Sequence, residues 1–376
     1  MTTAIKPTAT KPVTKLATAT TPAQPQADAP AFNPPPFVPR RYLSNGHLQT
    51  ILGNFLPRTN RLPRPESVLV EVSPATENQI STQILCHCHW QPVEVRASRP
   101  TAIIVHGLEG SSDSQYVIGN ANKLWASGAN VIRMNMRNCG GSSSPQHDMA
   151  RLTPTLYHSG LSSDVLAILR HFASLYSLQS ISLIGYSMGG NLVLKLAGDL
   201  GPDAPPELHS VIGVSPAIDL GPSADALHEP LNRVYELKFL RALLRRFRRK
   251  VAHFPRAYDA NVATGIRSLR DFDHRITALY SGFASADDYY HRAASARVLH
   301  RIAVPTLILN ALDDPFIRLT PETRATILAN PNITFIETTH GGHCAFLAAP
   351  SPQSSSLPDP NYWAETTLLQ FLLAHA

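Results

Sequence analysis

The sequence predicts an α/β protein with a mostly parallel central sheet and helices on both faces of that sheet. Three observations predict this class. Short apolar runs typical of strands alternate with segments whose apolar residues recur at helical spacing. One such run ends in a glycine-flanked serine, and an aspartate pair and a histidine pair follow later, each after another strand-like run. With 376 residues, of which 43% are apolar, the chain is long enough to bury a large core.

The first of these strand-like runs, 102–105, ends in the turn His106-Gly107-Leu108-Glu109-Gly110. A turn of this kind can present a backbone N–H group to an oxyanion, the charged oxygen that forms when a nucleophile attacks a carbonyl carbon. We expect the N–H of Leu108 to be one such donor.

The glycine-flanked serine lies in Gly185-Tyr186-Ser187-Met188-Gly189, directly after the strand-like run 181–184. A turn from strand to helix at this position is so tight that a Cβ at either flanking residue would crowd the strand or the helix. Apolar residues at helical spacing then predict a helix over 188–200. The hydroxyl of Ser187 should stand above the sheet as a nucleophile, with the N–H of Met188 as the second oxyanion donor.

Two adjacent aspartates, Asp313 and Asp314, follow the apolar run 305–310. Open α/β sheets place their sites at the carboxyl ends of parallel strands, so a carboxylate here is well positioned to orient a histidine. The acid in such arrangements usually stands directly before the proline of the turn, which favours Asp314. Asp313 remains the alternative, because either side chain could instead cap local N–H groups.

Two histidines follow the strand-like run 333–337, in the sequence His340-Gly341-Gly342-His343. The glycines let this loop fold back over the edge of the sheet. We expect His343 to be the general base, and His340 to be a supporting or exposed residue. The order nucleophile, acid, base is that of the α/β-hydrolase fold.

These residue types together indicate acyl-transfer chemistry. Serine is a weak nucleophile, so a neutral imidazole must take its proton during attack on an acyl carbon and return it to the leaving group. The expected cycle is acylation of Ser187 followed by deacylation, and it calls for no metal and no cofactor.

Several segments resemble motifs of the YheT-like branch of the α/β-hydrolases, which includes bacterial YheT and eukaryotic lipid esterases of the ABHD type. The likeness extends over roughly residues 40 to 375, with one departure at Arg137-Asn138-Cys139-Gly140-Gly141, where the family more often has an R-G-C-S-G turn. Besides the serine turn, the similar segments are 44–51, 106–111, 157–160, 272–273, 289–290, 310–316 and 341–343.

The resemblance implies a carboxylic-ester hydrolase that acts on small-molecule acyl esters, often of medium-chain or lipid character. The fold does not determine the substrate. Two alternatives stay open: an alcohol O-acyltransferase that uses the same acyl-enzyme, and a catalytically silent binding protein.

The composition predicts two regions. Residues 1–39 are rich in Thr, Ala, Pro and Lys and hold nine of the 32 prolines, so we expect a disordered tail. A targeting segment is the alternative, although its arginines are missing before Arg40. Residues 40–376 should form the α/β-hydrolase domain, and the segment of about 216–300 is long enough to hold an inserted helical cap.

The cap segment contains an amphipathic run that also carries many cations. The simpler interpretation is a cap helix that packs by its apolar face and keeps its charges in water. The alternative is peripheral contact with anionic lipid near the mouth of the site. The apolar residues assigned to one face are Val234, Leu237, Leu240, Leu244, Phe247 and Val251, and the interleaved cations are Arg241, Arg245, Arg246, Arg248, Arg249 and Lys250.

Other functions are disfavoured. A net charge of +6 permits nucleic-acid binding, but no basic groove with interleaved aromatic residues accompanies it. Strand alternation in Cys86-His87-Cys88-His89 would point the cysteines and the histidines to opposite faces, so only two metal ligands could converge. The chain shows no apolar stretch of membrane-spanning length, no secretory signal and only four irregularly spaced cysteines, which predicts a cytoplasmic location.

Overall fold

The structure is a computed structural model that describes residues 32–77, 80–141, 148–350 and 358–376. The chain divides after Asn33 into two units, and every element described below belongs to the second, Pro34–Ala376. Most of the tail predicted for residues 1–39 lies outside the described residues, so its predicted disorder stays a prediction.

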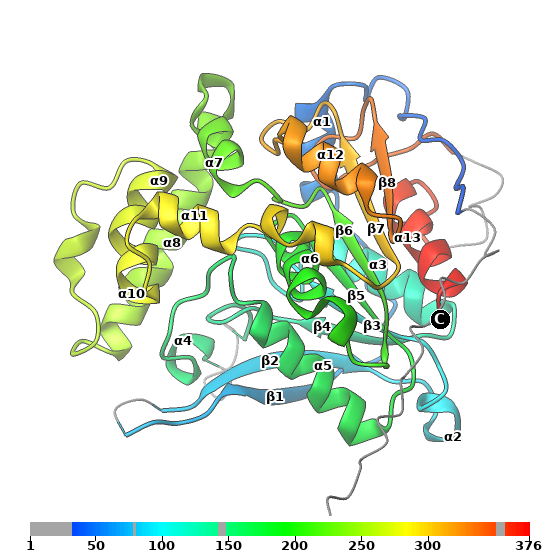
Figure 1. Ribbon diagram of the computed structural model, residues 1–376, viewed down its shortest axis with the longest axis horizontal. Helices are drawn as coiled ribbons and strands as arrows, with labels where there is room; N and C mark the ends of the chain where they lie inside the picture. Colours follow the sequence, from blue (N-terminus) through cyan, green and yellow to red (C-terminus); the bar gives the residue numbers. More distant parts are fainter. Residues whose placement is uncertain (1–31, 78–79, 142–147, 351–357) are drawn as a thin grey trace, which may run out of the picture. The chain divides into compact units, whose positions relative to one another are not determined.

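The strands of the described residues form an eight-stranded sheet in the order β1-β2-β4-β3-β5-β6-β7-β8 (Figure 1). β1 and β2 pair antiparallel, as do β2 and β4, and all the remaining pairs are parallel. The predicted mostly parallel sheet is therefore confirmed. The strands are β1 (Glu66–Ser73), β2 (Thr82–His89), β3 (Thr101–Val105), β4 (Asn130–Met134), β5 (Ile181–Tyr186), β6 (Leu208–Val214), β7 (Thr306–Ala311) and β8 (Ile333–Thr338).

The inner strands form the core. β3, β4, β5 and β7 are buried along their whole length, because helices cover both faces of a parallel sheet and leave no solvated side. The apolar runs predicted as strands are β3, β5, β7 and β8, with ends within a few residues of those expected. The helix predicted over 188–200 is α6 (Met188–Leu200).

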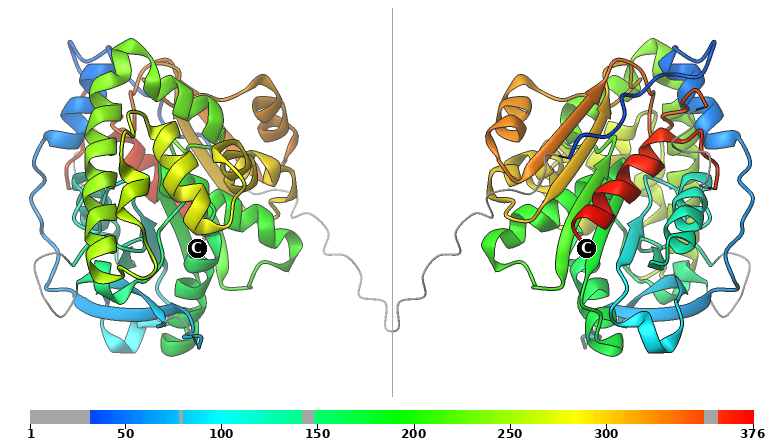
Figure 2. Two further views of the ribbon diagram at one scale, coloured as in Figure 1. Left: turned by 90° about the vertical axis from the view of Figure 1, so that its left-hand side faces the viewer. Right: turned by 90° about the vertical axis from the view of Figure 1, so that its right-hand side faces the viewer.

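Helices flank both faces of this sheet. α3 and α13 pack against each other on one face, and α5 and α6 pack against each other on the opposite face (Figure 2). No helix among the described residues is both long enough and apolar enough to cross a membrane. The flanking and connecting helices are α1 (Gly46–Phe55), α2 (Val93–Arg96), α3 (Gln115–Ala126), α4 (Met149–Leu152), α5 (Ser162–Tyr176), α6, α12 (Pro321–Ala329) and α13 (Trp363–Ala374).

A group of helices lies between β6 and β7, within the segment 216–300 where the sequence suggests a cap. Figure 1 shows them gathered to one side of the sheet. They are α7 (Leu220–His228), α8 (Arg233–His253), α9 (Leu269–Phe272), a π-helix (Asp273–Ala278), α10 (Leu279–Ser281) and α11 (Ala286–Ala293). We call this group the cap helices.

The apolar face predicted for α8 is wrong at its N-terminal end. Val234 is 76% exposed and Leu237 is 38% exposed, whereas Leu240 and Phe247 are buried as expected. The inward face instead includes Leu243. The reason is that the buried positions of α8 are Glu236, Leu240, Leu243, Phe247 and Lys250, a spacing of three and four residues that leaves Val234 and Leu237 on the outer side of the helix.

Two polar residues occupy the inward face of α8 in place of the expected apolar ones. Glu236 accepts a hydrogen bond from the N–H of Leu269 at 2.9 Å. Lys250 is fully buried and donates to the carbonyl oxygens of Ala150, at 2.8 Å, and Thr153. Each buried polar group thus has partners on another segment, which offsets the cost of its desolvation.

Candidate active site

Ser187 lies at the turn between β5 and α6 in a conformation that is rare for a non-glycine residue, with φ 54° and ψ −117°. The surrounding backbone holds it there. Its N–H donates to the carbonyl of Val214 at 2.9 Å, and its carbonyl accepts from the N–H groups of Asn191 and Ala217, both at 3.1 Å. A strained conformation persists only where the neighbouring structure determines it, as here.

The two glycines that flank the turn are required by close contacts. A Cβ on Gly185 would lie 2.2 Å from the carbonyl oxygen of Gly189. A Cβ on Gly189 would lie 2.4 Å from the carbonyl oxygens of Val105 and His106 at the end of β3. The backbones of β3, β5 and α6 therefore touch at this point, and only glycine allows it.

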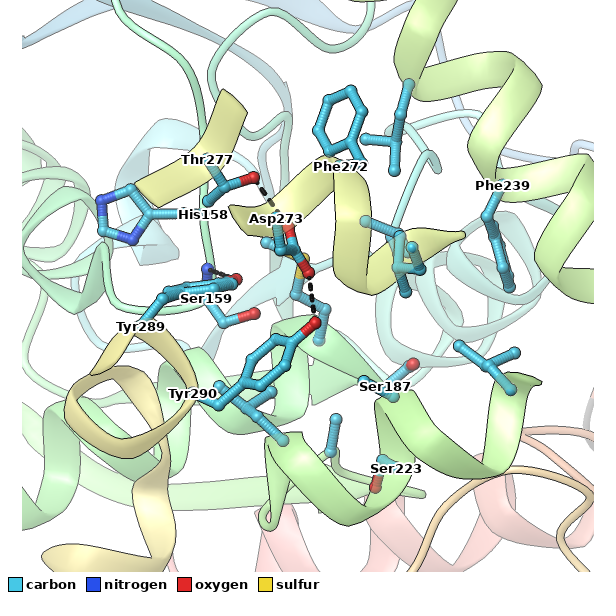
Figure 3. Close-up of a pocket in the computed structure, with 18 of the residues that line it drawn as sticks. His158, Ser159, Ser187, Ser223, Phe239, Phe272, Asp273, Thr277, Tyr289 and Tyr290 are labelled. Atoms are coloured by element: carbon cyan, nitrogen blue, oxygen red, sulfur yellow. Dashed lines mark hydrogen bonds between the residues drawn. The ribbon is translucent and has the colours of Figure 1, made fainter. Parts of the chain in front are cut away.

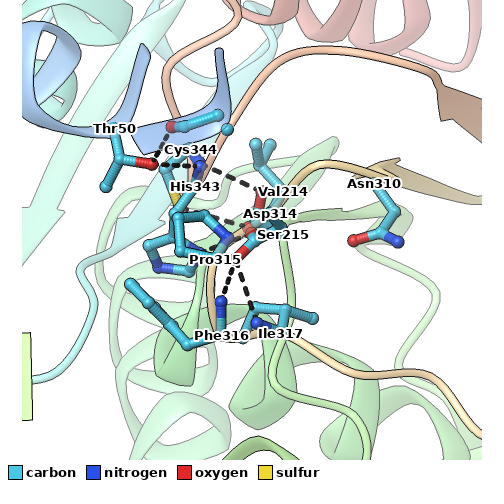
Figure 4. A network of polar contacts seen from close by, with 12 residues as sticks. Thr50, Val214, Ser215, Asn310, Asp314, Pro315, Phe316, Ile317, His343 and Cys344 are labelled. Atoms are coloured by element: carbon cyan, nitrogen blue, oxygen red, sulfur yellow. Dashed lines mark hydrogen bonds and ion pairs between the residues drawn. The ribbon is translucent and has the colours of Figure 1, made fainter. Parts of the chain in front are cut away.

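The structure brings Asp314 and His343 together beyond the ends of β7 and β8 (Figure 4). Nδ1 of His343 lies 2.8 Å from Oδ2 of the buried Asp314. Oδ1 of the same carboxylate accepts the N–H groups of Phe316, at 3.0 Å, and Ile317, at 2.9 Å. When the proton of neutral His343 is on Nδ1, it is donated to Oδ2 of Asp314, and Nε2 is left for proton exchange.

The electrostatics of His343 follow from this contact. Burial alone would lower the pKa of the imidazole, but the attraction of the Asp314 carboxylate outweighs burial and raises the pKa above its ordinary value. The ring of Phe316 packs against the imidazole, with the two ring centroids 4.2 Å apart.

Asp313 and His340 do not take part in the contact between Asp314 and His343. Oδ1 of Asp313 accepts the N–H of Gly342 at 2.8 Å. Oδ2 of Asp313 lies 3.5 Å from Nδ1 of His340, whose side chain is 40% exposed. Asp313 thus stabilises the loop that carries His343.

Helix α1 holds the acid turn and the histidine loop in place. Oγ1 of Thr50 accepts the N–H of His343 at 2.8 Å and donates to the carbonyl of Gly46 at 2.7 Å. A Cβ on Gly46 would lie 1.9 Å from the carbonyl oxygen of Asp313, and one on Gly342 would lie 2.4 Å from that of Gly46. The sequence singles out the segment containing Thr50 only as a family-like motif, so this contact was not predicted.

The turn after β3 lies against the serine turn, since a Cβ on Gly107 would be 3.1 Å from the Cβ of Ser187. The N–H of Gly107 donates to the hydroxyl of Tyr116 at 2.8 Å. His106 is buried, and its burial lowers the pKa to about 4, which keeps the ring neutral. Its Nε2 accepts the N–H of Met136 at 3.1 Å, so its Nδ1 carries the proton and donates to the carbonyl of Gly107 at 2.7 Å.

The two residues expected to supply oxyanion donors, Leu108 and Met188, line one cavity together with Ser187. Met188 is the first residue of α6, and N–H groups in the first turn of a helix have no partner within the helix. Leu108 is the residue after Gly107 in the turn that touches the serine.

An ion pair joins the turn after β3 to the cap helices. Glu109 has φ 56°, and both of its carboxylate oxygens contact the guanidinium of Arg246, with Nε–Oε1 at 2.8 Å and Nη2–Oε2 at 3.0 Å. The hydroxyl of Tyr157 donates to Oε1 at 2.5 Å, and Arg246 also donates to the carbonyl of Asn138. The sequence interpretation of Arg246 as one of several solvated cations is wrong, although its spacing from the buried Leu243 could have indicated an inward position.

Two cavities meet at Ser187. The first, which we call the cap cavity, has a volume of about 100 Å³ and is lined by the serine together with apolar residues of the cap helices such as Phe239 and Phe272 (Figure 3). The second, which we call the α1 cavity, has a volume of about 530 Å³ and is lined by α1, the start of α8, Ser187 and His343. His343 lines only the α1 cavity of the two.

The described residues contain no cluster of three or more His, Cys, Asp or Glu side chains suited to a metal ion. Cys86 and Cys88 lie buried in β2, as the predicted strand requires, and all four cysteines are free thiols.

Comparisons with known proteins identify the family. A family model described as "alpha/beta hydrolase fold" matches residues 100–350. The chain is 30% identical over 350 residues to "Putative esterase YheT" of Escherichia coli (strain K12), which covers 90% of this chain and 93% of that protein. It is also 30% identical over 264 residues to "Phospholipase ABHD3" of Bos taurus, covering 70% of this chain but only 62% of that longer protein.

Among solved structures, the 2,6-dihydroxy-pseudo-oxynicotine hydrolase has the same fold, with a TM-score of 0.51 and 16% identity over 82% of this chain and 68% of that chain. The fold and the family match define an α/β hydrolase, and the chain belongs to the YheT-like branch of that family.

Proposed function

We propose that this protein is a serine carboxylic-ester hydrolase, with Ser187 as nucleophile, His343 as general base and Asp314 as the acid that orients His343. The observation that carries the proposal is the 2.8 Å contact between the buried Asp314 and His343, at a cavity that Ser187 also lines. The names of its relatives, an esterase and a phospholipase, support acyl esters as the substrate class.

The reaction follows from the positions of these groups. Nε2 of His343 takes the proton of the Ser187 hydroxyl as its oxygen attacks the acyl carbon, and the N–H groups of Leu108 and Met188 stabilise the oxyanion. The ester bond then breaks, and His343 gives its proton to the leaving alcohol. In the second half, His343 takes a proton from water as the water oxygen attacks the acyl carbon. The bond from the acyl carbon to Ser187 then breaks, the serine oxygen takes the proton back from His343, and the carboxylic acid is released.

The position of His343 supports a proposed place for each half of the ester. The leaving alcohol must receive its proton from His343, so it should occupy the α1 cavity, which His343 lines. The acyl chain should then occupy the cap cavity, whose largely apolar wall suits a medium-chain or lipid-like chain. Acyl transfer to an alcohol uses the same machinery whenever an alcohol in the α1 cavity outcompetes water.

The test is hydrolysis of p-nitrophenyl esters from acetyl to palmitoyl, measured with the wild type and with Ser187→Ala. We expect turnover that peaks at one range of chain length and is lost in the variant. Parallel reactions with added alcohol separate hydrolysis from transfer, because transfer accumulates a new ester. Turnover that survives in Ser187→Ala would contradict the proposal.

We further propose that the outer face of α8 contacts anionic lipid. Lys238, Arg241 and Arg245 form one exposed stripe along this helix. At its start, the exposed Leu231 and Val234, 80% and 76% exposed, border the α1 cavity. An apolar rim beside a line of cations suits an anionic membrane surface, where each cation contributes about 1 kcal/mol.

Sedimentation with phosphatidylcholine vesicles, with and without phosphatidylserine, tests this contact. We expect binding only to the anionic vesicles, and its loss when Lys238, Arg241 and Arg245 are all replaced by Gln. The matched control replaces three exposed arginines away from α8, which are Arg64, Arg99 and Arg170. Equal loss of binding in both triple variants would show a general charge effect and would contradict the α8 surface.

A further inference from the structure

A single carboxyl group lies in the wall of the otherwise largely apolar cap cavity. Oδ1 of Asp273 accepts the hydroxyl of Thr277 at 2.7 Å, and Oδ2 accepts the hydroxyl of Tyr290 at 2.8 Å (Figure 3). All three residues line the cap cavity together with Ser187. The serine and the carboxyl group therefore face the same space.

Asp273 has no cationic partner among the described residues. The nearby Arg270 lies over the ring of Tyr290 at 5.2 Å, but its guanidinium pairs with the surface residues Asp225 and Asp287. Aspartate is rarely buried unless it is paired, because loss of hydration is costly for the charged form. Burial accordingly raises the pKa of Asp273 to about 6, against the opposing effect of the hydrogen bonds from Thr277 and Tyr290.

The carboxyl group has acceptor capacity left over. A carboxylate offers about four lone-pair sites, and the two hydroxyl groups use one on each oxygen. Asp273 also begins the π-helix 273–278, a rare element that is found frequently at functional sites. In an apolar cavity, a few polar groups of this kind usually determine which ligand binds and how it is oriented.

We infer that the cap cavity is a subsite for an acyl group that carries a hydrogen-bond donor along its chain, a hydroxyl or an ammonium group, and that Asp273 is the acceptor that selects it. The inference rests on the proposed function, in which the acyl chain enters the cap cavity. It adds a substrate class: functionalised acyl esters rather than plain alkyl esters.

The experiment compares p-nitrophenyl esters of equal chain length that end in a methyl, a hydroxyl or an amino group. A hydrogen bond to a charged acceptor is worth about 1.5–3 kcal/mol, so at the best chain length we expect kcat/KM to be about 10-fold or more higher for a donor-bearing ester. Comparing kcat/KM for the hydroxyl ester and the amino ester shows which of the two donors the subsite prefers. Equal rates for all three esters at every chain length would overturn the inference without any variant.

Asp273→Asn keeps the shape of the side chain and removes its charge. We expect the preference for the donor-bearing ester to fall to within about 3-fold, because a neutral acceptor forms a weaker hydrogen bond. The matched control is Asp287→Asn, which removes an exposed carboxylate from α11 and should leave the preference unchanged. A preference that survives in Asp273→Asn would overturn the role of Asp273.

The two proposals fail in different ways. Ser187-dependent hydrolysis without any preference for a donor would contradict only the subsite. Hydrolysis that persists in Ser187→Ala would contradict the proposed function itself.

Discussion

The carboxyl edge of the sheet and the cap helices meet at Ser187, but they are built in different ways. At the sheet edge, short backbone contacts and glycines without room for a Cβ hold Ser187 and His343. The cap contributes side chains instead, such as Arg246 against Glu109 and Asp273 in the cavity wall. We infer that residues at the sheet edge carry out the reaction, whereas residues of the cap adjust its rate and select the substrate. Substitutions at the edge should therefore abolish turnover, and those in the cap should modify it.

The sharpest test within the edge compares its two adjacent aspartates. Asp314→Asn should lower kcat by about 10⁴-fold, because it removes the carboxylate that holds the tautomer of His343. Asp313→Asn should lower kcat by about 10-fold at most, since an amide oxygen can still accept the N–H of Gly342. Steady-state kinetics on one soluble ester measures both. Similar losses in the two variants would contradict the assignment of Asp314.

The next largest effect on kcat is expected when the ion pair between the cap and the sheet edge is broken. Arg246→Gln breaks the ion pair with Glu109 and should lower kcat by about 10- to 100-fold with little change in KM, because it loosens the turn that presents the N–H of Leu108. Arg245→Gln, one residue away on the exposed stripe, serves as the control and should behave as the wild type. An equal response of the two variants would show that the ion pair does not position the turn.

The pH dependence should show a smaller effect with a defined sign. Hydrolysis requires neutral His343, and Asp314 raises the pKa of this group, so kcat/KM should rise with pH through a midpoint above about 6.5, the ordinary imidazole value. The residual activity of Asp314→Asn should have a lower midpoint. A wild-type midpoint at or below the ordinary value would contradict the predicted effect of Asp314.

The same pKa affects stability. Because the folded pKa of His343 is raised, protonated His343 stabilises the folded state fully at a pH below the unfolded value, and this contribution is lost as the pH rises through the folded pKa. Urea unfolding of the wild type and of His343→Ala at several pH values measures it. The difference in unfolding free energy between the two proteins should shrink toward high pH.

The sheet edge could be predicted from the sequence because its signals are local. An apolar run and a glycine-flanked serine are enough to place β5, the turn and α6. The choice between Asp313 and Asp314 could not be made from local signals alone, since both fit the same turn. The proline that follows Asp314 favours this residue, but the contact itself depends on the spatial position of His343, 29 residues further along the chain.

The cap could be predicted only as a helical insertion. Which cations of α8 point inward depends on partners far away in the chain: Glu109 is 137 residues from Arg246, and Thr153 is 97 residues from Lys250. The same holds for Thr50, which reaches His343 across 293 residues. The spacing of apolar residues predicts a helix, but it does not predict which polar residues form buried contacts with distant parts of the chain.

The most direct test of the central claim is to locate the covalent label left by a fluorophosphonate, which reacts with an activated serine. Mass spectrometry should find the label on Ser187 in the wild type, an added ester substrate should slow the labelling, and His343→Ala should label far more slowly. A label on another residue, or ester turnover by a protein that Ser187 labelling does not inhibit, would contradict Ser187 as the nucleophile.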